Sequence, residues 1–252
     1  MPVRPWWGRG HVRPRAWRPS RCAAISCALL TGMGIASTAH AQWSGSVSVT
    51  NDERWRGRSL SVGRPAMTVS LGYDDRSGIY ADAAATAAAL PTGADLVSIG
   101  VDAGYALRLR RGIVLDLGLT RREFRGAGSG VRGAGYSEVY LGASGRSLAA
   151  RILYSPDYLR SGVQTLYGTL DAVARPLPKW RLLGHAGVMA VVRQRPWGDV
   201  AGTQFDYSLG VARQLGKVDA RLAWSGGLPG RDFYRYRDHA RRAVTVSAAI
   251  GF

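Results

Sequence analysis

The chain ends in the stretch RAVTVSAAIGF, residues 242–252, in which apolar residues alternate with small or polar ones. One set of alternate positions holds Val244, Val246, Ala248, Ile250 and Phe252, and the other holds Ala243, Thr245, Ser247, Ala249 and Gly251. Successive side chains of a β-strand point to opposite faces, so this pattern predicts a strand with one apolar and one polar face.

The same alternation recurs along the chain and predicts twelve strands, at residues 44–51, 65–73, 78–87, 95–107, 112–122, 135–143, 146–154, 162–174, 180–192, 202–213, 217–226 and 240–252. The connections between these segments are long and short in turn. An even number of strands of about ten residues, with short turns at one end and long loops at the other, is typical of bacterial outer-membrane barrels. We therefore expect an all-β fold, a transmembrane antiparallel β-barrel of about 12 strands with short periplasmic turns and longer extracellular loops.

A secreted β-sandwich would also show alternating strands. The predicted strands are longer than those of most soluble sheets, and a tilted strand of about ten residues covers the roughly 25 Å apolar band of a membrane barrel. One face, which we assign to the lumen, carries charged residues, and the opposite face is nearly free of charge through its middle. The lumen residues are Asp82, Asp102, Asp116, Glu138, Arg151, Asp171, Asp206, Asp219 and Arg221. Both observations favour the membrane barrel.

The first 41 residues have the composition of a secretory signal peptide. They hold six arginines and no acid, then an apolar stretch from Cys22 to Ala36, then the small-residue site Ala39-His40-Ala41. A basic arm that binds nucleic acid would not need the apolar stretch, so no nucleic-acid partner is predicted. Cleavage before Gln42 would leave residues 42–252 as one exported barrel and lower the net charge by six, from +17 to +11.

Neither a cofactor nor a metal ion is predicted. Cys22 and Cys27, the two cysteines of the chain, would leave with the signal peptide. The motif at residues 128–133 fits G-x-G-x-x-G, but a dinucleotide site needs a helix after it and a strand follows here. The remaining histidines, His185 and His239, lie in different segments without metal-ligand spacing.

Arginine dominates the long loops, and we predict an extracellular rim made by Arg54, Arg56, Arg58, Arg193, Arg195, Arg235 and Arg237. Guanidinium groups match phosphate well, so lipid and lipopolysaccharide headgroups of the outer membrane are expected partners. If the lumen conducts, a positive rim would also give a weak preference for anions at low salt.

The first loop carries a more particular resemblance. Trp55-Arg56-Gly57-Arg58-Ser59, Gly63-Arg64-Pro65-Ala66, Tyr73 and Gly78-Ile79-Tyr80-Ala81 are similar to the opening of an uncharacterised Gram-negative family of the Gcw_chp type. The resemblance covers roughly residues 44–90 and the last strand, and departs from the family pattern at Glu53 and at the alanines of 83–89. It implies an outer-membrane barrel and carries over no catalytic residues. Phe252 resembles the terminal aromatic residue by which the barrel-assembly machinery recognises its substrates.

Three functions remain open from the sequence. The first is a porin-like passive channel for small polar solutes, if water separates the lumen charges. The second is a structural or interaction barrel without conduction, if opposite charges pair and close the lumen. The third is an outer-membrane hydrolase that uses Asp238 and His239 in the last long loop. Such a pair is usually solvated, so we expect first that the protein is not an enzyme.

Overall fold

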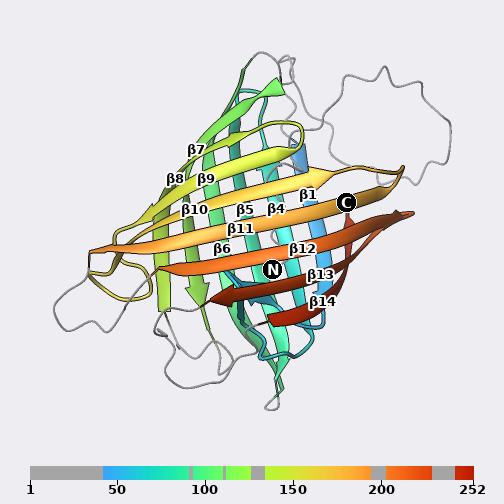
Figure 1. Cartoon of the computed structure of the whole chain (residues 1–252), viewed down its shortest axis with the longest axis horizontal. Coiled ribbons are helices and arrows are strands. Elements are labelled where there is room, and N and C mark those ends of the chain that lie inside the picture. The colour runs from blue at the N-terminus through green and yellow to red at the C-terminus, as the bar shows by residue number, and fades with distance from the viewer. Residues whose placement is uncertain (1–41, 91–92, 110–111, 126–133, 194–202, 229–241) are drawn as a thin grey trace, which may run out of the picture.

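The computed structural model of the protein describes residues 42–90, 93–109, 112–125, 134–193, 203–228 and 242–252. Within them, twelve long strands form one closed antiparallel barrel (Figure 1). These are β1 (Gln42–Thr50), β4 (Ala66–Asp74), β5 (Ile79–Leu90), β6 (Gly93–Arg108), β7 (Val114–Phe124), β8 (Ala134–Ser144), β9 (Leu148–Ser155), β10 (Gln164–Ala174), β11 (Trp180–Arg193), β12 (Gln204–Leu215), β13 (Val218–Leu228) and β14 (Arg242–Gly251).

The barrel closes between its first and last strands. β1 pairs with β14 on one side and with β4 on the other, so that Val47 lies opposite both Ile250 and Val69. Closure leaves no edge strand with unpaired backbone groups. The predicted all-β barrel of twelve antiparallel strands is confirmed. The main difference lies at β5 and β6, which continue beyond the predicted ends until they meet at residues 90 and 93.

The outer face of the barrel is apolar and exposed. Leu119, Leu141 and Leu209 have 60–64% of their surface exposed, and their neighbours along each strand face inward. None of the described segments is a helix long and apolar enough to cross a membrane. Such a continuous apolar surface is far larger than a soluble monomer usually shows.

Tyrosines on the inner face lie across glycines of neighbouring strands. Tyr80 covers Gly104, and Tyr140 covers Gly118. A Cβ atom at either glycine would collide with the tyrosine ring, so glycine is required where the ring lies flat against the wall. These rings therefore pack against the inner wall of β5–β8.

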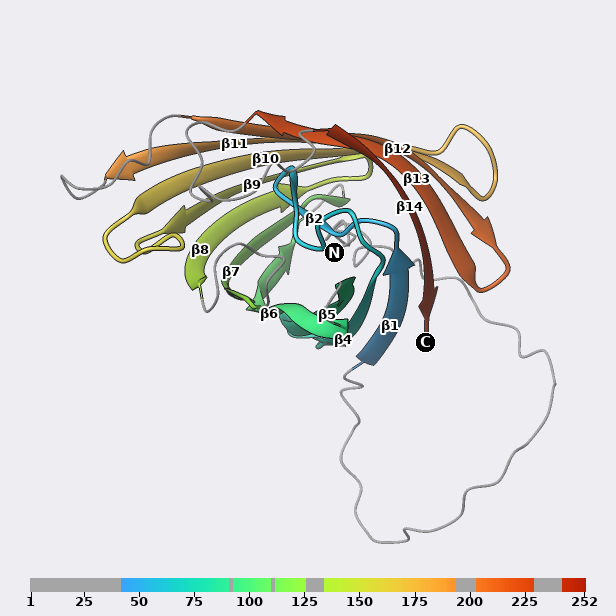
Figure 2. The same ribbon diagram turned by 90° about the horizontal axis from the view of Figure 1, so that it is seen from below.

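One loop turns into the barrel. Residues 52–61, which we call the inner hairpin, contain the short paired strands β2 (Arg54–Trp55) and β3 (Arg58–Ser59). Figure 2, which looks along the barrel, shows this segment inside the ring of strands. The barrel therefore contains a constriction made by its own first loop.

Candidate functional site in the barrel interior

The base of the inner hairpin is held by one carboxylate. Asp52 pairs with Arg54 at 3.1 Å and accepts hydrogen bonds from the hydroxyls of Ser59 and Ser61 and from the backbone N–H of Gly63. Each of these partners lies within the same loop, so the hairpin can form its shape locally. Hydrogen bonds to a charged acceptor are stronger than neutral ones.

The tip of the hairpin is anchored to the opposite wall by Arg56. Its guanidinium pairs with Glu138 of β8 at 2.6 Å and lies 3.9 Å from the ring centre of Tyr167. The rings of Tyr136 and Tyr158 are both 5.3 Å away. Burial opposes the charge on Arg56, but the carboxylate of Glu138 and the surrounding tyrosines hold its pKa well above the ordinary value. The anchor is therefore charged at every physiological pH.

This arrangement corrects the predicted extracellular rim. Arg54 and Arg56 were expected at the rim, but both are buried, because their charges find carboxylate partners inside the barrel. Arg58 is half-buried and donates a hydrogen bond to Gln204. Arg193 is exposed at the end of β11. Arg195, Arg235 and Arg237 lie outside the described residues.

The nine charged residues assigned to the lumen all belong to inward-facing positions. Most are paired across strands: Arg122 with Asp102 at 2.9 Å, Arg151 with Asp116 at 2.7 Å, Arg181 with Asp219, and Arg56 with Glu138. Asp82 lines the cavity that these pairs border. Arg221 makes no ion pair with any described residue, and its only recorded hydrogen bond is a long one, 3.5 Å, to Ser208.

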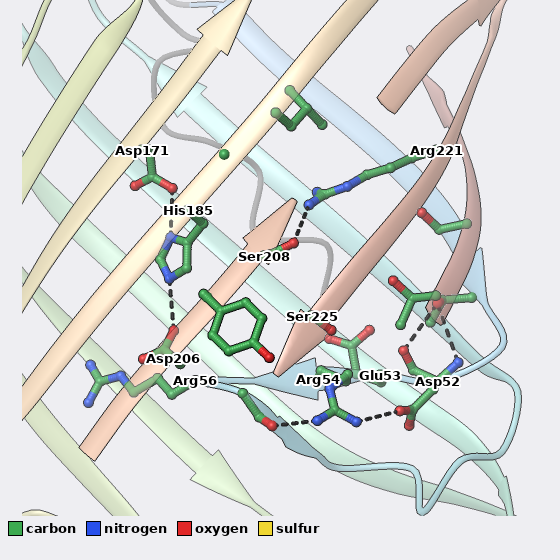
Figure 3. Close-up of a pocket in the computed structure, with 17 residues that line it drawn as sticks. Asp52, Glu53, Arg54, Arg56, Asp171, His185, Asp206, Ser208, Arg221 and Ser225 are labelled. Carbon is green, nitrogen blue, oxygen red and sulfur yellow. Dashed lines mark hydrogen bonds and ion pairs between the residues drawn. The ribbon is translucent and has the colours of Figure 1, made fainter. Parts of the chain in front are cut away.

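His185 is an interior residue that the sequence analysis missed. Its Nδ1 atom lies 2.8 Å from Asp171 and its Nε2 atom 2.8 Å from Asp206 (Figure 3). Each ring nitrogen therefore faces a carboxylate of a neighbouring strand. The inward parity of His185 along β11 is the one sequence signal that could have placed it.

Two cavities in the barrel interior share Asp171 and His185 in their lining. The larger, about 760 Å³, is lined by small residues such as Ser46, Ser70 and Ala249 and by arginines of other strands. The smaller, about 110 Å³, lies between the inner hairpin and the wall of β11–β14 (Figure 3). Six residues line both cavities: Arg56, Asp171, Leu183, His185, Arg221 and Ser247. We call them the junction.

No metal centre is assembled in the part of the chain that the structure describes. Its His, Cys, Asp and Glu side chains form no group of three or more that could hold a metal ion. Asp238, His239 and the glycine-rich motif at 128–133 lie outside the described residues, as do residues 1–41. Phe252 lies against Gly45 on the outer face, beside the last residue of β14.

A substitution at Gly57 tests how closely the inner hairpin packs against β13. Its φ is +75°, and a Cβ atom there would lie 2.8 Å from Gly226 O and Gly227 Cα of β13. We expect Gly57→Ala to lower the free energy of unfolding by about 1–3 kcal/mol, from backbone strain together with the collision. Gly63→Ala is the matched control, since Gly63 has a φ of +69° but nothing within 4 Å. Equal losses in urea titrations of the two variants in lipid vesicles would contradict the described seat.

Comparison with solved structures finds porins of the same architecture. The NanC porin aligns with a TM-score of 0.54 at 11% identity, over 82% of this chain and 98% of that chain. The KdgM porin aligns with a TM-score of 0.48 at 11% identity, over 83% and 98%. At 11% identity the likeness to the NanC porin shows the fold alone, a porin-like barrel.

Sequence comparison gives a family. No curated protein sequence matches the chain. The family described as "Bacterial protein of unknown function (Gcw_chp)" matches residues 35–233, which include the inner hairpin and eleven of the twelve barrel strands. The resemblance seen in the first loop is confirmed, and the chain belongs to the Gcw_chp family.

Proposed function

We propose that the protein is an outer-membrane channel for the passive passage of small polar solutes, narrowed by the inner hairpin. The observation that carries this proposal is the polar interior, with two cavities that meet at the junction. A sealed structural pillar would need its interior filled by side chains, whereas a cavity of about 760 Å³ is within the size range of solute-binding clefts.

The membrane location rests on the outer face. Its leucines and valines are exposed on every side of a closed barrel, where lipid is the solvent that suits them. In this setting residues 1–41 would be a cleaved signal peptide, both ends of residues 42–252 would lie in the periplasm, and Phe252 would contact the assembly machinery. Exposed loop arginines such as Arg193 would face lipopolysaccharide phosphates.

Conduction requires that solutes pass beside the hairpin, not through it. Its tip is fixed by Arg56 to the wall of β8 and β10, and its base is fixed by Asp52. On its other side the lining includes short hydroxyl side chains, among them Thr50, Ser225, Thr245 and Ser247. We therefore infer a narrow, hydroxyl-lined route along β13, β14 and β1.

The alternative is a structural or interaction barrel without conduction. It is favoured by the pairing of most lumen charges, which neutralises groups that would otherwise attract water.

A measurement of ion conduction distinguishes the channel from the structural barrel. We expect discrete current steps when refolded residues 42–252 are added to a planar lipid bilayer in potassium chloride. Protein that migrates as a folded barrel on unboiled gels but gives no current would overturn the channel in favour of the structural role.

A further inference from the structure

We infer that Arg221, Ser208 and Ser225 form a binding site for the carboxylate group of small solutes at the junction. The site rests on the proposed function, because it would hold solutes on their way through the channel. Figure 3 shows the three side chains on the wall of β12 and β13, with Arg221 extended toward Ser208.

Arg221 is an interior cation that makes no ion pair with any described residue. None of the described acids lies within ion-pair distance of Arg221: Asp219 pairs through Oδ2 with Arg181, and Asp171 and Asp206 are both bonded to His185. The Nε atom of Arg221 is buried and has no hydrogen-bond partner among the described residues. A half-buried guanidinium with no acid at ion-pair distance is costly, so an anion bound here would supply the partner that the described residues do not.

Ser225 supplies an independent observation. The residue is 9% exposed, and its hydroxyl is buried without a hydrogen-bond partner among the described residues, although it lines the smaller cavity. Buried polar groups are normally satisfied, and an exception calls for a missing water or ligand. The register sets Ser225 directly opposite Ser208, to which Arg221 extends. A guanidinium and two hydroxyls thus converge, and they can offer hydrogen bonds to one acceptor.

The surroundings select a singly charged ligand. Asp52, Glu53, Asp171 and Asp206 also line the smaller cavity, so a second negative charge would be repelled. The volume of about 110 Å³ is several times the roughly 10–15 Å³ that a water needs, which admits a carboxylate group. Planar carboxylates also match the two parallel N–H groups of a guanidinium.

The test uses acetate and saturation-transfer-difference NMR on the refolded barrel, residues 42–252, in detergent at low salt. We expect a saturable signal from the acetate methyl group, a loss of affinity of at least tenfold in Arg221→Gln, and a loss of several-fold in Ser225→Ala. Arg146→Gln removes the same charge from an exposed turn and is the matched control. It should bind as the unmodified protein does.

Stability and conduction separate the possible failures. If Arg221 served only the fold, Arg221→Gln would unfold at lower urea, whereas a binding role predicts equal or higher stability. Absence of saturable binding, or an equal loss in Arg146→Gln, would overturn the site. A barrel that conducts potassium chloride but does not bind acetate retains the proposed function without this site. A barrel that binds acetate but carries no current would support the binding site and overturn the channel function.

Discussion

Replacing Arg56 by alanine is expected to destabilise the barrel by about 3–5 kcal/mol and to raise its single-channel conductance several-fold. The substitution leaves Glu138, 1% exposed, as a charge without its partner, and it removes the cation from between three tyrosine rings. Without this anchor the tip of the inner hairpin has lost its ionic contact with β8. The constriction should then widen.

The two effects can be measured separately. Urea titration in lipid vesicles reports the free energy of unfolding, and planar-bilayer recording reports the conductance. The double variant Arg56→Ala with Glu138→Gln removes the uncompensated charge, so we expect it to regain much of the stability and keep the large conductance. A single variant with unchanged conductance would show that the hairpin does not narrow the path.

The second large effect concerns two adjacent alanines in the middle of β5. Ala85 lies on the outer face and Ala84 lines the larger cavity. Ala85→Arg would place a guanidinium against the hydrocarbon of the membrane, which costs about 2–4 kcal/mol at the bilayer midplane. Ala84→Arg would place the same side chain in a polar interior, where it finds water and carboxylates such as Asp82.

The pair is its own control, since the residue, the substitution and the strand are the same. We expect Ala85→Arg to reduce the yield of barrel that resists unfolding on unboiled gels. Ala84→Arg should assemble normally and lower the conductance, because it adds bulk to the cavity. Equal assembly of the two variants would contradict the membrane location. Loss of assembly in Ala84→Arg alone would show that Ala84, not Ala85, faces the lipid.

The alternation of side chains along the strands was sufficient to predict the architecture of this protein. A strand sends successive residues to opposite faces whatever lies around it, so the apolar and polar sets of residues 242–252 are visible without any partner strand. The same local rule placed Asp116, Glu138 and Asp206 on the inner face. It works because the faces of a barrel strand meet two such different environments.

The contacts between side chains inside the barrel depend on the tertiary structure. Arg56 is part of a long polar loop, and nothing near it in sequence shows that Glu138 and Tyr167 will surround it. Likewise, the contacts of His185 with Asp171 and Asp206 come from two neighbouring strands. These pairings depend on the register between strands and on closure of the barrel, which set distances between residues far apart in the chain. Local periodicity carries no information about those distances, so it shows which residues face the lumen but not which of them meet.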